Sequence, residues 1–253
     1  MIENSQMKLG RKAIKWDSRR LMMRNYLTPA LPPPPAAVDW TKGIASWGMM
    51  MNDTLGDCTI AGVGHAVQVW SANLGNEITL SDTAIQAAYE LWDGYNPADP
   101  STDQGGVEET VLDDWRQQGF AGHKLLAYAD PEPTNLTDIR QSIWLFGGCY
   151  IGVALPLTAQ TQDVWDVVPD DGSGSSEAGS WGGHCVFVPK YDMAYPYTLT
   201  CITWGQLKTM TVAFWRKYVD EAHTLFGQDW LAANGAPSGF NLQQLQADLN
   251  AIH

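Results

Sequence analysis

Cys58 is the residue of this sequence best placed to act as a nucleophile. It follows a short polar loop, residues 52–57, and it opens an apolar segment in which Ile60, Val63 and Val67 lie three or four positions apart. That spacing predicts a helix with an apolar face. A thiol in the first turn of a helix lies near the positive end of the helix dipole, which favours the thiolate. Cys58 is therefore either a nucleophile or a buried, inert thiol.

A nucleophilic thiol needs a base, and we expect His184 to supply it. His184 follows two glycines and opens an apolar run, residues 184–188, that predicts a strand. A base at the start of such a strand could face a helix from another part of the fold. His65 lies on the same predicted helix as Cys58, about 10 Å further along its axis, which is too far for a direct hydrogen bond. We expect His223 to lie on a surface helix.

The charge of the chain is unevenly distributed. Its 253 residues carry a net charge of −13, yet seven of the fifteen lysines and arginines lie within the first 24 positions. The remainder has 8 basic and 26 acidic side chains, a net charge of −18. Such an acidic body argues against nucleic acid as a partner. We expect the basic N-terminal arm to lie on the acidic body instead.

Cysteine spacing and hydropathy exclude several classes of protein. The four cysteines, Cys58, Cys149, Cys185 and Cys201, form no closely spaced pair, so we expect no structural zinc site. We also expect no other metal and no cofactor. No run of eighteen apolar residues is present, which argues against a membrane span. No apolar segment of a secretory signal follows the basic N-terminus. We therefore expect a cytoplasmic protein.

The pattern of helices and strands predicts an α+β fold with two lobes and a cleft between them. Residues 1–36 form the basic arm and a proline-rich connector, and residues 37–253 form the domain. We place a helical lobe at about 37–133, a β-rich lobe at about 134–226 and a C-terminal tail helix at 239–252. Helices are expected near 58–74, 81–94, 106–118, 134–147, 214–226 and 242–252, and strands near 124–128, 149–155, 184–188, 198–204 and 207–212.

The order of these motifs resembles the papain-like cysteine peptidases over roughly residues 31–226. Asn52 lies six residues before Cys58, where the family has a glutamine, and His184 opens a strand far downstream. The remaining points of resemblance are Val38-Asp39-Trp40 at the start of the body, Leu80-Ser81-Asp82, Gly105-Gly106 before the third helix, and Thr203-Trp204-Gly205, which is similar to the Asn-Ser-Trp-Gly of the family.

The resemblance implies a papain-like fold and a role for each matching residue. Cys58 would attack a carbonyl as a thiolate, and His184 would pass the proton to the leaving amine. The side-chain amide of Asn52 and the backbone N–H of Cys58 would bind the oxyanion. Trp204 would shield the histidine from water. A peptide or protein substrate would lie in the cleft between the lobes.

Three positions depart from the pattern of the family. Asn52 is one methylene shorter than glutamine. Ile202 occupies the place of the asparagine that orients the histidine; Gln206 could replace it if the strand continues, whereas Thr203 should point the other way. Asp57 adds a carboxylate that would stabilise an imidazolium but oppose a thiolate. An inactive papain-like protein that binds peptides or proteins, or an acyltransferase, therefore remains an alternative to a peptidase.

The basic arm is too short to resemble the inhibitory propeptide of the family. We therefore expect any latency to have another source. The acidic loop at residues 163–177 could cover the cleft, but we interpret it as a solvated surface loop.

Overall fold

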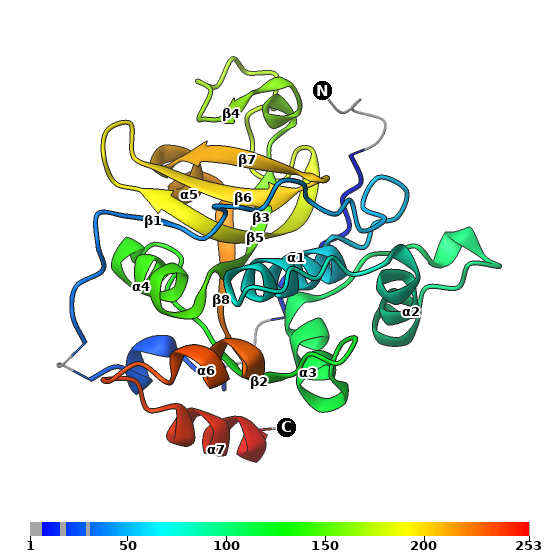
Figure 1. Ribbon diagram of the computed structural model, residues 1–253. Coiled ribbons are helices and arrows are strands. Elements are labelled where there is room, and N and C mark those ends of the chain that lie inside the picture. The colour runs from blue at the N-terminus through cyan, green and yellow to red at the C-terminus, as the bar shows by residue number, and fades with distance from the viewer. Residues whose placement is uncertain (1–6, 16–18, 29–30, 253) are drawn as a thin grey trace.

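The computed structural model describes residues 7–15, 19–28 and 31–252, and helix α1 (Cys58–Asn73) crosses its middle. Every residue of α1 from Cys58 to Ser71 is buried. Small residues make this burial possible, since a side chain at Gly62 would press against the Tyr150 ring. The helix packs against a large sheet on one side and against further helices on the other (Figure 1).

The helices over residues 82–93, 108–118, 136–146 and 242–252 begin and end close to the predicted positions, whereas the helix over residues 228–234 was not predicted. The side chain of Ser81 accepts a hydrogen bond from the amide of Ala84, as an N-cap does, and Gly94 and Gly147 end their helices in the left-handed conformation. The remaining helices are α2 (Asp82–Asp93), α3 (Glu108–Gln118), α4 (Leu136–Phe146), α5 (Val212–Tyr218), α6 (Gln228–Asn234) and α7 (Leu242–Ile252), with 3-10 helices η2 (Met23–Tyr26), η3 (Pro100–Thr102) and η4 (Leu157–Thr161).

One mostly antiparallel sheet forms the second part of the fold. Its strands follow the order β2-β8-β3-β5-β6-β7-β4, with β1 paired to β5, and β4–β7 is the parallel pair. The strands are β1 (Ala37–Asp39), β2 (Leu125–Ala129), β3 (Cys149–Leu155), β4 (Val164–Trp165), β5 (Gly182–Asp192), β6 (Thr198–Thr203), β7 (Gln206–Thr211) and β8 (Val219–Gly227). The predicted α+β class is confirmed.

The prediction of one helix over residues 214–226 is wrong in its second half. Helix α5 ends at Tyr218, and the chain continues as β8, which pairs with both β2 and β3. His223 is consequently buried in a strand rather than exposed on a helix. Val219–Gly227 contains Asp220, Glu221, His223 and Thr224, and all its residues except Asp220 are buried, so neither a regular alternation nor an apolar run distinguishes it as a strand.

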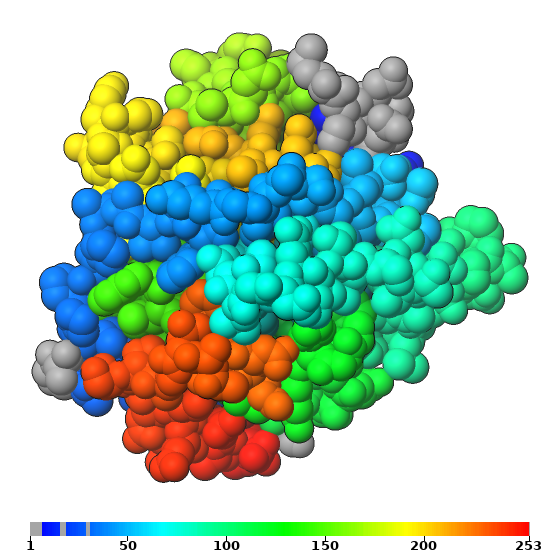
Figure 2. Space-filling model, viewed as in Figure 1, coloured from blue at the N-terminus to red at the C-terminus, as the bar shows by residue number. Residues whose placement is uncertain are grey.

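Two apolar cores lie within the molecule. One contains the buried side chains of α1, with Trp70 and Phe187, and the other contains Trp165, Trp204 and Phe214. Figure 2 shows the blue segment that precedes α1 as a band between the yellow and orange strands and the cyan helix. No helix in the described part of the chain is long and apolar enough to cross a membrane.

We predict that Phe187→Ala lowers the free energy of unfolding by about 3–5 kcal/mol, because it leaves a cavity beside the Trp70 ring. Leu91→Ala is the control, since Leu91 is 69% exposed on α2, and it should change stability by less than about 0.5 kcal/mol. Urea unfolding of the three proteins measures both effects. Equal stability of the two variants would contradict this account of the core.

Candidate active site

The N-terminal arm covers the predicted site. Residues 7–15 run in an extended conformation past the start of α1 and the start of β5. Four hydrogen bonds between backbone groups hold the arm: Lys8 N to Asn52 O at 3.1 Å, Gly106 N to Gly10 O at 2.8 Å, Arg11 N to Gly183 O at 3.1 Å and Lys12 N to Gly106 O at 2.8 Å. One side chain adds a fifth, since Trp204 Nε1 donates to Lys8 O at 3.1 Å. Hydrogen bonds of this kind are how an extended peptide adds to an exposed backbone edge.

We expected any latency to have a source other than the arm, and this expectation is wrong, because the arm itself covers Cys58 and His184. A complete propeptide is unnecessary, because a few extended residues reach from Asn52 to Gly183. The loop at residues 163–177 is mostly exposed, in agreement with its interpretation as a surface loop.

Cys58 begins α1, as predicted, but its thiol is completely buried. Burial raises the pKa of Cys58 to about 12, and the nearby Asp57 acts in the same direction. Hydrogen bonding from the backbone of Cys185 and of Gly10 acts against this shift. Cys185 directly follows His184 in β5, so the thiol lies against the chain segment that carries the histidine. The arm contributes to the burial, because Gly10 belongs to it.

His184 is also fully buried, near the start of β5. Its Nε2 lies 2.7 Å from Thr203 Oγ1, and its Nδ1 has no hydrogen-bond partner among the described residues. The Trp204 ring stacks on the imidazole, with centroids 4.4 Å apart and planes at 11°. Burial lowers the pKa of His184 to about 3, and the charges of His65 and Arg11 add to this effect.

Thr203 is the group that contacts the histidine, so the expectation that it points away is wrong. The register between β5 and β6 shifts between Phe187 and Lys190, which changes the position that faces His184. Gln206 pairs opposite Thr203 across the turn, and within the described chain no hydrogen bond joins its side chain to His184. A simple alternation rule could not reveal this irregularity.

Asn52 and Asp57 contact each other beneath the arm. The Asn52 side-chain amide donates to Leu55 O at 3.3 Å and to Asp57 Oδ1 at 3.2 Å. Asp57 is completely buried, and burial raises the pKa of its carboxyl well above the ordinary value. Burial therefore disfavours the charged form of the carboxylate that the sequence placed beside the thiol.

A buried cluster of charges, which the sequence analysis missed, lies beside these residues. The Arg11 guanidinium is within 3.0 Å of three carboxylates, those of Glu108 (3.0 Å), Asp220 (2.7 Å) and Glu221 (2.8 Å). The prediction that the basic arm lies on the acidic body is thus confirmed. The acids come from α3 and β8, which are far apart in the sequence, so no local motif announced them.

His223 forms the inner part of the same cluster. Its Nδ1 lies 2.6 Å from Asp130 Oδ1, and its Nε2 lies 3.1 Å from Glu221 Oε1. Burial alone would lower its pKa, but the two carboxylates outweigh burial and raise it to about 10. Burial raises the pKa of Glu108, whereas His223 and Arg11 outweigh burial at Glu221 and lower its pKa.

Comparison with solved structures identifies the fold. Over 89% of this chain and 98% of the other, it is similar to xylellain, a cysteine protease from Xylella fastidiosa, with a TM-score of 0.65 and 12% identity. Digestive procathepsin L 3 of Tenebrio molitor larval midgut matches 88% of this chain and 76% of its own at a TM-score of 0.57 and 12% identity. A stem bromelain precursor matches 88% of this chain and 80% of its own, with a TM-score of 0.55 and 13% identity.

These similarities show a papain-like fold, as the sequence analysis expected. No protein-family profile and no curated protein sequence matches the chain.

We predict that Gly10→Ala displaces the arm, because a Cβ at this position would clash with the carbonyl of Gly56. Cys58 would then be exposed and its pKa would fall from about 12, so alkylation by iodoacetamide at pH 8 should accelerate by more than about tenfold. Lys8→Ala is the matched control, since the Lys8 side chain is exposed. Peptide mapping by mass spectrometry measures the labelling of each cysteine. An unchanged rate at Cys58 would show that the arm does not limit access.

We also predict that stability declines as pH rises from about 6.5 to about 10. The raised pKa of His223 means that its contribution is complete below the unfolded pKa of about 6.5 and is lost as pH approaches 10. Urea unfolding across this range should show a fall of a few kcal/mol, and His223→Gln should flatten the profile. Identical profiles for the two proteins would mean that His223 is not charged in the fold.

Proposed function

We propose that this chain is a thiol peptidase or amidohydrolase in which Cys58 is the nucleophile and His184 is the general base and acid. The observation that supports it best is the extended segment of the arm, which lies between the elements that carry these residues. Gly10 contacts the Cys58 thiol, and the neighbouring Arg11 binds Gly183, the residue before His184. A groove that holds a peptide backbone at a thiol and an imidazole suits the cleavage of amide bonds.

The hydrogen bond between His184 Nε2 and Thr203 Oγ1 is compatible with the tautomer that this chemistry requires. When Thr203 Oγ1 accepts from Nε2–H, the lone pair of the imidazole is on Nδ1, which no described residue occupies. Nδ1 then removes the proton of the Cys58 thiol, and the thiolate attacks the carbonyl carbon of the substrate. The imidazolium donates this proton to the leaving amine. A water that His184 deprotonates then cleaves the thioester and regenerates the thiol.

Thr203 thus takes the orienting role that the sequence analysis considered for Gln206. A hydroxyl is neutral and stabilises an imidazolium less than a carboxylate would. The stacked Trp204 ring holds the imidazole in its plane and shields it from water. The orientation of His184 therefore depends on one hydrogen bond and one aromatic contact.

The covered form of the site is unsuited to catalysis. With a pKa of about 12 at Cys58 and about 3 at His184, both groups are neutral at pH 7. Displacement of the arm admits water to the thiol and removes the positive charge of Arg11 from the neighbourhood of His184. Both changes favour the thiolate–imidazolium pair.

The oxyanion would bind to the backbone N–H of Cys58 and to the side chain of Asn52. Each such donor contributes roughly 3 kcal/mol in a working enzyme. Asn52 must release one of its two present acceptors to do so, and the contact with Leu55 O, at 3.3 Å, is the longer of the two. The substrate would be a peptide or a protein in the groove that the arm now fills.

The proposal is tested with the Gly10→Ala protein and a fluorogenic peptide mixture. Cys58→Ala should abolish hydrolysis in this background, whereas Cys149→Ala, a buried cysteine in β3, should retain it. Thr203→Val should lower kcat by about 10- to 100-fold, because His184 loses its orienting partner. Thr200→Val is the matched control, since Thr200 lies in the same strand and contacts Thr209 instead.

Hydrolysis that survives Cys58→Ala would overturn the assignment of the nucleophile. A complete absence of turnover in the Gly10→Ala protein, with peptides still bound, would favour a binding protein on the same scaffold. Transfer of the acyl group to an added amine, in place of hydrolysis, would favour an acyltransferase.

A further inference from the structure

The Arg11 side chain fills a pocket that is built around its guanidinium. Glu108 at the start of α3 and Glu221 in β8 provide buried carboxylates, and Asp220 adds a half-exposed one. Gly152 in β3 leaves room, because a Cβ there would clash with the guanidinium. Glu108, Glu221, Asp220 and Gly152 line the space that the Arg11 side chain fills, and we call this space the arginine pocket. Elements from three parts of the fold thus converge on a single positively charged group.

The arginine pocket needs a cation to be stable. Glu108 and Glu221 are almost completely buried, at 1% and 2% exposure, and neither oxygen of Glu108 receives a well-formed hydrogen bond from the described residues. Arg11 balances their negative charge: its Nε lies 3.0 Å from Glu108 Oε1, and its Nη2 lies 2.8 Å from Glu221 Oε2. Removal of this cation would leave Glu108 with only His223 Nε2, 3.6 Å from its Oε2, and would leave Glu221 Oε2 without its partner, which is destabilising for buried carboxylates. If the arm leaves the groove, another cation must replace Arg11 or the carboxylates must take up protons.

A metal ion does not suit this position, although Glu108, Glu221 and His223 come close enough to one another for one. Both ring nitrogens of His223 are engaged with carboxylates, Nδ1 with Asp130 and Nε2 with Glu221. A doubly hydrogen-bonded, protonated imidazole has no lone pair to donate to a metal. The cation that fits is organic, and its shape can be inferred from Arg11.

The contacts favour arginine over lysine. Arg11 uses two different nitrogens, Nε toward Glu108 and Nη2 toward Glu221 and Asp220. A planar guanidinium reaches both sides of the pocket at once, whereas an ammonium presents its charge at a single point.

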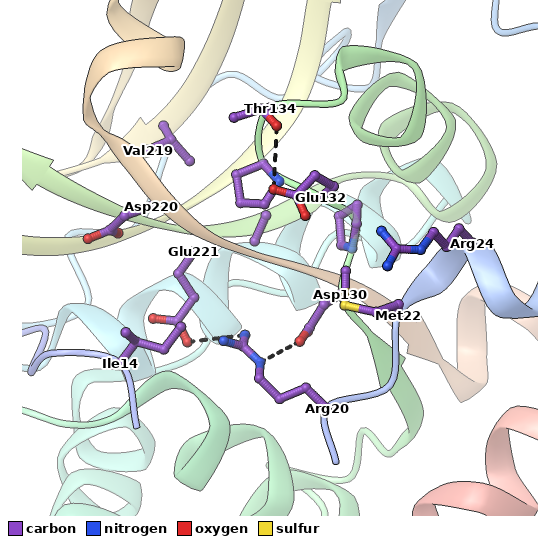
Figure 3. Close-up of a pocket in the computed structure, with 13 residues that line it drawn as sticks. Ile14, Arg20, Met22, Arg24, Asp130, Glu132, Thr134, Val219, Asp220 and Glu221 are labelled. Carbon is purple, nitrogen blue, oxygen red and sulfur yellow. Dashed lines mark hydrogen bonds and ion pairs between the residues drawn. The ribbon is translucent and has the colours of Figure 1, made fainter. Parts of the chain in front are cut away.

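The rest of the arm would keep part of the cluster intact after residues 7–12 leave. Arg20 lies on the other side of Glu221 and bonds to Asp130 at 2.6 Å, beside a cavity of about 510 Å³ (Figure 3). Its segment is held independently by hydrogen bonds between Met23 and Asp130 and between Asp130 and Leu21. Arg20 and His223 can therefore stay on Glu221 Oε1 while Oε2 faces the emptied pocket.

The pocket lies next to the reactive thiol. Gly10 contacts Cys58, and the adjoining residue is Arg11, whose side chain enters the pocket. The backbone of Gly106 pairs with the arm on both sides of Arg11, through Gly10 and Lys12. Any extended chain that pairs with this edge presents one side chain to the pocket within two residues of the thiol.

We propose that the arginine pocket is a substrate subsite, and that the enzyme prefers peptides with arginine within two residues of the bond it cleaves. This inference rests on the proposed peptidase function. The arm then acts as a mimic of the substrate, with Arg11 in the place of the substrate arginine.

The direct test uses the full-length Arg11→Ala protein, whose pocket is empty. Millimolar N-acetyl-arginine amide should raise its thermal unfolding temperature, because the ligand restores the missing cation. N-acetyl-citrulline amide, a neutral compound of the same shape, should leave it unchanged, and the wild-type chain should respond to neither. Equal effects of the two compounds, or no effect, would overturn the subsite. Glu221→Gln added to Arg11→Ala should abolish the response.

A second measurement separates this inference from the proposed function. Peptidyl epoxides that differ only in arginine or citrulline at the second residue should alkylate Cys58 of Arg11→Ala at rates about tenfold or more apart. Equal alkylation would leave the nucleophile in place and refute the subsite. Stabilisation by the arginine compound without alkylation of Cys58 would support the subsite and refute the peptidase. If Arg11→Ala does not fold, the same comparison is made with Arg11→Lys.

Discussion

The ion pairs of Arg11 with Glu108 and Glu221 are the interaction on which the state of this molecule depends. They are buried, so each charge is stable only while the other is present. The backbone of the arm adds hydrogen bonds on both sides of Arg11, and these fix the register of the arm in the groove. Because Gly10 directly precedes Arg11, seating of the guanidinium brings the backbone of Gly10 onto the Cys58 thiol.

Burial of this thiol determines its protonation. A thiol at the start of a helix is expected to ionise more readily than a free one, yet the pKa of Cys58 is raised, because removal from water outweighs the helix dipole. His184 is neutral for the same reason. In our proposal the same residues are therefore silent when the arm is seated and reactive when it leaves.

The surroundings of His184 depend on an irregularity that the sequence does not reveal. Thr203 holds Nε2 of His184 at 2.7 Å, and Trp204 covers the ring. The shift in register between β5 and β6 places a threonine where alternation predicted none. Burial disfavours the charged form of Asp57, which lessens the conflict with a thiolate that its sequence position suggested. The similarity to xylellain, at 12% identity, is a similarity of fold.

The sequence by itself determined the features that depend on neighbouring residues. The start of α1 at Cys58, the cap at Ser81 and the strand at Cys149–Leu155 follow from local spacing, and the order of these elements was enough to predict the α+β fold. The tertiary structure alone decided the partner of His184, the burial of His223 and the joining of Glu108 with Glu221. The first two depend on which strands pair and in which register, and the third depends on how α3 and β8 come together; no local pattern in the sequence records these arrangements.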